Sequence, residues 1–231
     1  MASSTNLIQR YARNEPTITH EEQQILANKR VCICGCGGIG GYAVELLARA
    51  GVGTLIAVDG DTFESSNLNR QLLSREDNLG QPKALAAKER VEAINSDVEV
   101  LAYAEFITEK NVSKLLAGCD VVVDALDSSK TRLQLEDWCS QTGVPLIHGA
   151  IAGWYAQVTT IAPGPHVLKT IYPAADEEIG PKPGAPSFAP ALCASLQVAE
   201  CLKVLLGKGE PLYNKLLVVD LLRNTRRVID L

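Results

Sequence analysis

The residues best suited to chemistry begin with the glycines of the stretch GCGGIGG. Gly35, Gly37 and Gly40 have the spacing G-x-G-x-x-G, directly after an apolar run and directly before a helical pattern. Glycine lets the backbone turn tightly and approach a ligand closely, while the unpaired N–H groups at a helix start attract negative charge. The pattern therefore predicts a phosphate-binding turn. The alternative is a tight turn that only packs the helix on the strand.

The second chemical group is the carboxylate of Asp59, at the end of the apolar stretch TLIAVD. It lies roughly 20 residues beyond the last glycine, where an acidic residue is placed to accept hydrogen bonds from ribose hydroxyls. The glycines and Asp59 together predict a nucleotide site, and they suit NAD as well as ATP.

Polar residues that follow Asp59 distinguish these nucleotides. The segment DGDTFESSNLNRQLLSREDNLGQPK places several of them within reach of the same strand end: Asp61, Asn67, Arg70, Gln71 and Lys83. NAD has no use for two further cations, whereas Arg70 and Lys83 can neutralise the β and γ phosphates of ATP. They can also stabilise the charge that develops on pyrophosphate as it leaves. We therefore expect a site for ATP.

Two further carboxylates, Asp124 and Asp127, lie in the segment DALD at the end of another apolar run. Open α/β sheets bind ligands outside the carboxyl ends of their strands. Asp127 is predicted to hold Mg²⁺, which prefers one or two carboxylates together with phosphate oxygens and water. Asp124 lies nearer the buried strand, so we expect it to be structural, as we do His148.

The elements that must position these residues alternate along the chain. Apolar runs predict strands, and patterns of helical period predict helices between them. Strands are expected at 30–34, 54–59, 98–104, 119–126 and 144–150, and helices at 21–28, 42–51, 81–95, 109–117 and 130–141. A β-rich second half follows, with a helix at 191–206 and paired strands in KLLVVDL and RRVIDL.

This order predicts an α/β fold with a Rossmann-like, doubly wound, mainly parallel sheet, extended by antiparallel strands in the C-terminal half. We expect one domain over residues 1–231. Residues 1–20 lack periodicity and are predicted to form an arm outside the core. Residues 172–190 are rich in proline, glycine and acidic side chains, which predicts a crossover loop on the surface.

The composition argues against several other classes. With 46% hydrophobic and 21% charged residues, the chain is typical of a soluble globular protein. A polar start without an apolar signal core predicts a cytoplasmic protein, and no membrane role is expected. A net charge of −5 without a long basic block makes nucleic acid a poor partner. Seven cysteines include no C-x-x-C pair, so zinc is not expected.

In their order and spacing, these motifs resemble the MoeB/ThiF/HesA family of adenylyltransferases. The resemblance covers nearly the whole chain and rests on GCGGIGG, VDGD, NLNRQ, LGQPK, DALDSSKTR and PLIHGAIAG. It implies that certain residues occupy the family's ATP-binding and catalytic positions, namely Gly38, Asp59, Asn67, Arg70, Lys83 and Asp127. It also implies that Arg13 enters the site of a partner subunit, and therefore a homodimer.

The resemblance further implies a reaction. The C-terminal glycine carboxylate of a small ubiquitin-like sulfur-carrier protein, with a Gly-Gly tail, would attack the α phosphate of ATP and release pyrophosphate. Such a carboxylate is already ionised near neutral pH, so no general base is needed. The catalytic task is positioning and charge stabilisation, by Mg²⁺ and the side chains of Arg13, Arg70 and Lys83.

The chain departs from the family pattern in its cysteines. Many relatives carry two zinc-binding C-x-x-C pairs where this chain reads PHVLKTIYP and RRVIDL, and residues 172–190 contain no cysteine. We therefore expect adenylation without a covalent thioester, and a packing role for Cys193. Two other interpretations stay open. One is a dehydratase of threonylcarbamoyl-adenosine in tRNA, and the other is a non-catalytic scaffold subunit of an activating-enzyme complex.

Overall fold

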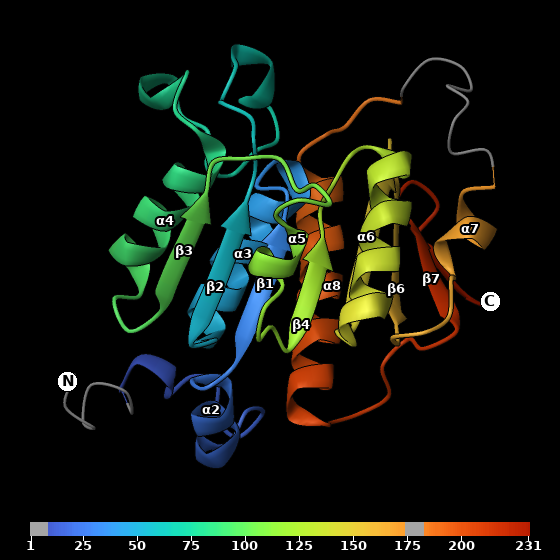
Figure 1. Ribbon diagram of the computed structural model, residues 1–231, viewed down its shortest axis with the longest axis horizontal. Coiled ribbons are helices and arrows are strands. Elements are labelled where there is room, and N and C mark those ends of the chain that lie inside the picture. Colours follow the sequence, from blue (N-terminus) through green and yellow to red (C-terminus); the bar gives the residue numbers. More distant parts are fainter. Residues whose placement is uncertain (1–8, 174–182) are drawn as a thin grey trace.

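One eight-stranded sheet forms the centre of the protein (Figure 1). The computed structural model describes residues 9–173 and 183–231. The strands have the order β3-β2-β1-β4-β5-β6-β7-β8. Their bounds are β1 Arg30–Cys34, β2 Thr54–Val58, β3 Glu99–Tyr103, β4 Val121–Asp124, β5 Leu146–Ala152, β6 Tyr155–Ile161, β7 Lys215–Asp220 and β8 Thr225–Asp230.

The first five strands are parallel, and β6, β7 and β8 continue the sheet in antiparallel pairs. The predicted fold class is thus confirmed. The strand order reverses at β1, which pairs with β2 on one side and with β4 on the other. Such a reversal opens a crevice at the carboxyl ends of the strands, where doubly wound sheets bind their ligands.

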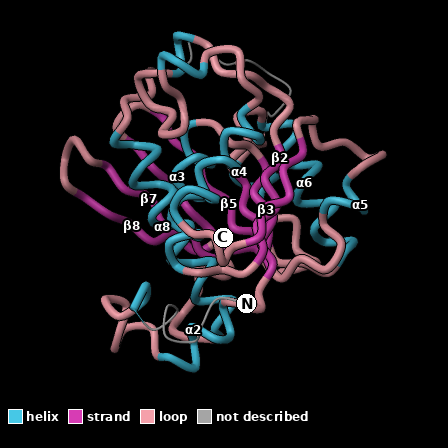
Figure 2. The backbone as a smooth tube through the Cα atoms, turned by 90° about the vertical axis from the view of Figure 1, so that its left-hand side faces the viewer, coloured by secondary structure: helices cyan, strands magenta, loops and turns pink. Residues whose placement is uncertain are grey.

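Helices cover both faces of the sheet (Figure 2). One face carries α3, α4 and α8, and the other carries α5, α6 and α7. The helices are α2 His20–Leu26, α3 Gly38–Ala50, α4 Lys83–Ile94, α5 Val112–Leu115, α6 Ser129–Thr142, α7 Leu168–Ile171 and α8 Phe188–Leu206. All but the short α7 lie near predicted helices, because the apolar side chains of a surface helix recur at its own period.

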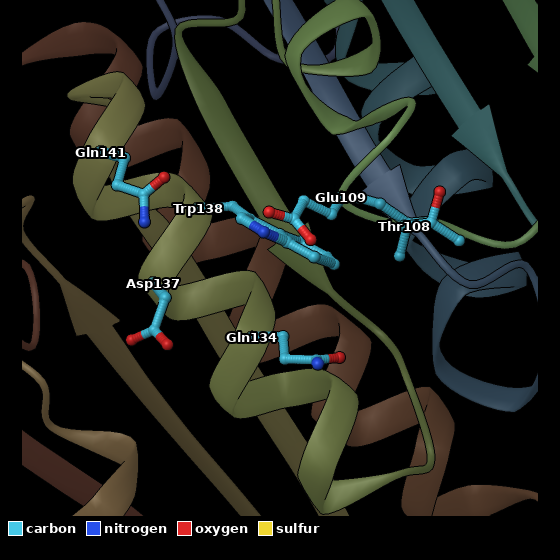
Figure 3. A pocket seen from close by; sticks show the side chains of 7 residues that line it. Thr108, Glu109, Gln134, Asp137, Trp138 and Gln141 are labelled. Atoms are coloured by element: carbon cyan, nitrogen blue, oxygen red, sulfur yellow. The ribbon is translucent and has the colours of Figure 1, made fainter.

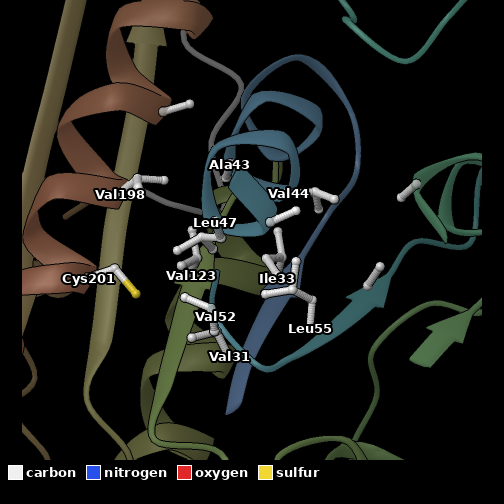
Figure 4. Packing of buried hydrophobic residues seen from close by; sticks show 14 of the residues in the cluster. Val31, Ile33, Ala43, Val44, Leu47, Val52, Leu55, Val123, Val198 and Cys201 are labelled. Carbon is white, nitrogen blue, oxygen red and sulfur yellow. The ribbon is translucent and has the colours of Figure 1, made fainter. Parts of the chain in front are cut away.

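Both layers of the core meet at β1. Val31 and Ile33 point into the cluster under α3 and α8, whereas Cys32 and Cys34 point into the cluster under α5 and α6. Successive strand residues face opposite sides, so one short strand anchors both layers. Figure 4 shows the first cluster, in which Val31 and Ile33 lie beside Leu47 of α3. Cys32 and Cys34 are fully buried and are thus packing residues of the core.

The long helix α8 has the length and apolar composition to cross a membrane, yet it packs in the core against α3, β5 and β6. It begins at Phe188, so the prediction of a loop through residue 190 was wrong at its end. Pro190 is the third helical residue, where its missing N–H has no partner within the helix to lose. Residues 174–182 of the predicted crossover loop lie outside the described residues.

The prediction that residues 1–20 form an arm outside the core was wrong for Tyr11. This side chain is buried, and its hydroxyl accepts a 2.8 Å hydrogen bond from the Asn95 amide. It also fills the space beside Gly51, where a Cβ atom would lie 2.5 Å from the hydroxyl oxygen. One aromatic side chain thus anchors the segment at the far ends of α3 and α4, a contact without any periodic signal in the sequence.

Candidate active site

The glycine-rich turn joins β1 to α3 and can only be built from small residues. Gly35 has a φ of +96°, and a Cβ atom there would lie 2.6 Å from the Ala125 carbonyl oxygen. At Gly40 a Cβ atom would meet the Gly35 carbonyl oxygen at 1.8 Å. Both glycines are therefore required by the turn and by its packing against the end of β4.

The N-terminus of α3 is open to a ligand. Gly37 is the N-cap and supplies no side chain to the N–H groups of the first turn. Such groups carry the positive end of the helix dipole and favour an anion. A Cβ atom at Gly38 would have only ordinary contacts, 3.6 Å to Pro190 and 3.8 Å to Arg70. Those two side chains therefore line the turn.

Asp59 follows β2 and connects it with the glycine turn. One carboxylate oxygen accepts a 2.7 Å hydrogen bond from the Cys36 N–H, and the other accepts from the Asp61 N–H at 2.8 Å. Burial raises the pKa of Asp59, while these backbone donors and nearby Lys83 act in the opposite direction. The predicted ribose-binding carboxylate thus lies directly beside the predicted phosphate-binding turn.

Lys83 is the buried cation of the site. It is the first residue of α4, and only 7% of its surface is exposed. Its ammonium lies 3.2 Å from the Asp61 carboxylate, and its N–H donates to the Asp61 carbonyl. Burying an unpaired ammonium group costs free energy. Lys83 is paired with one exposed carboxylate only, that of Asp61, so its ammonium is suited to bind a further anion.

The intervening segment brings Arg70 to the glycine turn. The half-buried Arg70 donates to the Ser66 carbonyl at 3.0 Å and to the Asn69 side chain at 2.9 Å. Asn67 is buried, and its amide oxygen accepts from the Glu64 N–H at 3.1 Å, which caps a turn of 3₁₀ helix. This local bond explains why an asparagine is needed here. The predicted contact of Asn67 with the nucleotide stays a prediction.

Gln71 lies buried beside the glycine turn. Only 6% of its surface is exposed, and its amide nitrogen would lie 3.5 Å from a Cβ atom at Gly37. Its Oε1 atom has no hydrogen-bond partner among the described residues. A buried polar atom without a partner is uncommon and calls for an explanation, such as a ligand or water. The predicted nucleotide-binding role of Gln71 supplies one.

The two carboxylates of DALD have separate environments. Asp124 is fully buried and its carboxylate lies 2.6 Å from the Nδ1 atom of His148, so the expected structural roles of both residues are confirmed. Asp127 is exposed on the turn after β4 and forms no hydrogen bond or ion pair with the described residues. Its position beyond a strand end suits the coordination of Mg²⁺ between phosphate oxygens.

Arg13 does not join this group. It is exposed and lies two residues from Tyr11, which is anchored at the ends of α3 and α4. The glycine turn lies at the opposite end of α3, whose 13 residues span about 20 Å. In Figure 1, α2 and residues 9–19 before it lie at the lower end of the sheet, and the parallel strands point to the upper end.

Sequence reasoning missed three polar residues beside the site. They are the buried Arg132 and Gln197 and the half-buried Tyr172, and their hydrogen bonds join β4, β5 and the segment after α7. For Gln197 a signal existed, since it is a single amide within an apolar helical pattern. It donates to the carbonyl oxygens of Asp124 and Ile147 at 2.7 and 2.9 Å. Its side chain fills the space that Gly149 leaves open.

A hollow of about 420 Å³ lies elsewhere, between α6 and the chain after β3 (Figure 3). Its lining includes Trp138 with the carboxylates of Glu109 and Asp137, and none of the predicted site residues. Asp137 already pairs with His166 at 3.0 Å. The hollow is therefore a surface feature separate from the glycine turn.

No group of three or more His, Cys, Asp or Glu side chains within residues 9–173 and 183–231 could hold a metal ion. All seven cysteines are buried and free. The expectation that the protein lacks zinc stays a prediction.

Comparison with known proteins agrees with the sequence motifs and the geometry. A sequence model of the ThiF family matches residues 11–231. The SAMP-activating enzyme E1 of Haloferax volcanii is 38% identical over 220 residues, which cover 92% of this chain and 81% of that protein. The sulfur carrier protein adenylyltransferase of Thermus thermophilus is 37% identical over 231 residues, covering 92% of this chain and 82% of that protein.

A solved structure has the same architecture. That of E. coli MccB with ATP superposes with a TM-score of 0.78 at 26% identity, covering 96% of this chain and 71% of that chain.

Proposed function

This chain belongs to the ThiF family, and on that premise we propose that it is an ATP-dependent adenylyltransferase. Its substrate is the C-terminal glycine carboxylate of a small ubiquitin-like sulfur-carrier protein. The observation that carries the proposal is the gathering of an uncapped helix start, a ribose-type carboxylate and two cations around one turn: Gly37, Asp59, Arg70 and Lys83. Names of the similar proteins from H. volcanii and T. thermophilus support the substrate class.

Each group has a task in nucleotide binding. Asp59 accepts from the ribose hydroxyls, and the N–H groups at the start of α3 hold phosphate oxygens. Lys83 and Arg70 approach the β and γ phosphates from the side of α4 and the 66–70 segment. Asp61, which pairs with Lys83 in this structure, limits the cost of the buried ammonium until phosphate arrives.

The chemical step transfers AMP. A carboxylate oxygen of the carrier tail bonds to the α phosphorus, the bond to the bridging oxygen breaks, and pyrophosphate leaves with the electron pair. The residues that hold Mg²⁺ would include Asp127, and the ion supplies positive charge to the phosphate oxygens. Lys83, Arg70 and Arg13 stabilise the charge on the departing pyrophosphate.

Arg13 must act across a dimer interface. Its anchor at the far end of α3 keeps it about 20 Å from the glycine turn of its own chain. Two residues of extended chain span only about 7 Å, so the arm cannot return to that turn. We therefore propose a homodimer in which each arm completes the partner's site. We also propose that the protein works in the cytoplasm.

An exposed apolar patch offers a docking surface for the folded body of the carrier. It consists of Trp154, Tyr155, Phe188 and Leu222, each at least 40% exposed. The Trp154 and Phe188 rings lie 4.6 Å apart, and Phe188 begins the helix whose Pro190 lines the glycine turn. A glycine tail has no side chains to recognise, so affinity must come from such a separate surface.

Carrier-dependent exchange of pyrophosphate into ATP tests the proposal. A cognate carrier that ends in Gly-Gly should support exchange, whereas the same carrier without its last glycine should bind but not react. Leu222→Glu should raise the carrier KM without changing ATP binding. Equal exchange with the truncated carrier, or with a free small carboxylate, would reject the protein-tail substrate and favour the tRNA-modifying alternative. Absence of ATP binding would favour the scaffold.

A further inference from the structure

The hydroxyl of the half-buried Tyr172 is the centre of a hydrogen-bond network beside the site. It lies 2.9 Å from Arg132 Nη1, 3.0 Å from Gln157 Nε2 and 3.1 Å from His148 Nε2. Arginine and amide nitrogens only donate, so they occupy both acceptor positions of the hydroxyl. The Tyr172 proton is therefore left for His148 Nε2, which must accept it.

Because Nε2 of His148 accepts this hydrogen bond, the proton of the neutral imidazole lies on Nδ1. Its Nδ1–H donates to the Asp124 carboxylate at 2.6 Å. Burial lowers the pKa of His148 and raises that of the Tyr172 hydroxyl, so both keep the protonation states that these bonds need. Arg132 Nε lies 3.8 Å from Asp124 Oδ2, so the positive charge of the guanidinium balances the negative charge of the carboxylate.

Both ends of the network reach one peptide segment. The other Asp124 oxygen accepts from the Leu126 N–H at 3.0 Å. Arg132 donates two hydrogen bonds to the Leu126 carbonyl, one of them from Nε at 3.1 Å. Leu126 is thus held at its N–H and at its C=O, and the next residue is Asp127. Ala125, on its other side, packs against Gly35 of the phosphate-binding turn.

We propose that Tyr172 is a positioning residue of the reaction, which acts through His148, Asp124 and Arg132 to fix the turn that carries Asp127. The inference rests on the proposed function. Tyr172 caps the C-terminus of α7, and α7 is attached to α6 because Glu136 accepts from the N–H groups of Val167 and Leu168. The network therefore connects the segment after β6 with the predicted metal-binding carboxylate.

Tyr172→Phe removes only the central oxygen and is the first test. In the purified full-length protein, carrier-dependent exchange should fall about tenfold in kcat, and half-maximal activity should require severalfold more Mg²⁺. Arg132→Lys keeps the positive charge but loses the two guanidinium donors to the Leu126 carbonyl, so its effect should be similar to that of Tyr172→Phe. Tyr103→Phe in β3, where the ring lies under Lys114, is the matched control and should be unchanged.

A double-mutant cycle separates positioning from simple stability. If Tyr172 acts through Asp127, then Asp127→Asn should cost at least fivefold less in the Tyr172→Phe background than in the wild type. Independent effects that multiply, with an unchanged Mg²⁺ requirement, would overturn the inference.

Hydrogen exchange of the Leu126 amide gives a readout that needs no reaction. It should be faster in Tyr172→Phe than in Tyr103→Phe. If the wild type does not exchange pyrophosphate into ATP, the proposed function is wrong. The hydrogen-exchange rate of the Leu126 amide then still tests whether the network holds the turn. Equal protection in both variants would show that it does not.

Discussion

The Asp59 carboxylate accepts a 2.7 Å hydrogen bond from the backbone N–H of Cys36, which fastens the end of β2 to the glycine turn. The second oxygen holds the Asp61 N–H in the same way. Each oxygen keeps further acceptor capacity for a ligand, because a carboxylate has about four lone-pair positions. Asp59 therefore shapes the turn and remains able to bind a ribose.

Replacing Asp59 by asparagine should weaken ATP binding about 10- to 100-fold, since hydrogen bonds to a charged acceptor contribute about 1.5–3 kcal/mol. Calorimetric titration with ATP and Mg²⁺ measures this, and wild-type protein should bind ATP much more tightly than NAD. Asp77→Asn, at an exposed carboxylate paired with Arg75, is the control. Equal affinities of the two variants, or a preference for NAD, would contradict the nucleotide assignment.

Lys83→Ala should reduce the rate of pyrophosphate exchange about 10²- to 10³-fold. Removing one preorganised group that stabilises charge in the transition state typically lowers the rate by this factor. Lys88→Ala removes an exposed lysine from the same helix, one that pairs with Glu92, and should leave the rate unchanged. Circular dichroism of both variants checks that α4 persists. Similar rates in the two variants would remove Lys83 from the catalytic group.

The thiols should play no covalent part. All seven cysteines are buried, and burial raises the pKa of Cys193 to about 12, so this thiol holds almost no thiolate near neutral pH. We expect native protein to resist alkylation and denatured protein to react fully. Cys193→Ala should keep its carrier-dependent exchange. A thioester between carrier and enzyme that dithiothreitol cleaves would show that one of these thiols becomes accessible.

Patterns local in sequence predicted much of the fold and part of the site. The strand at 30–34 matches β1, and the antiparallel C-terminal strands were also expected, because apolar alternation and turn residues are local signals. The glycine turn and Asp59 were found for the same reason. A strand end fixes where a side chain can lie, and sheet topology then brings such ends together.

Long-range polar contacts could not be predicted in this way. His148 and Tyr172 are 24 residues apart, and Arg132 and Tyr172 are 40 apart, with no periodic pattern joining them. The pairing of Asp61 with Lys83 likewise depends on a bridge between Thr62 and Pro82 that folds the segment back. Such contacts are decided by the packed tertiary structure rather than by propensity.

His148 should make the fold sensitive to acid. Burial lowers its pKa in the folded state, so below the unfolded value of about 6.5 the unfolded chain binds the proton first. Unfolding free energy should therefore fall as pH drops from about 7 to 5, by up to roughly 1.4 kcal/mol per unit. Urea unfolding across this range measures it. His148→Gln should be less stable at pH 7 but flatter with pH, and an equally steep profile would exclude His148 as the cause.

The dimer prediction rests on the place where Arg13 is anchored. Tyr11 holds the segment at the C-terminal ends of α3 and α4, so Arg13 can complete only the site of a partner. Arg13→Ala should lose most of its exchange activity while keeping its fold. Arg10→Ala is the matched control, because Arg10 already bonds to the Ile94 carbonyl and Asp97 of its own chain.

Mixing Arg13→Ala with Asp127→Ala chains should restore activity that neither has alone. After random exchange half of the dimers are hybrids, and each hybrid has one site with Asp127 on its own chain and Arg13 from the partner. Recovery should approach about one quarter of the wild-type rate. Mass spectrometry of the intact dimers confirms exchange of subunits. No recovery in a mixture with proven hybrids, or a monomer in sedimentation that retains full activity, would show that Arg13 does not act across the interface.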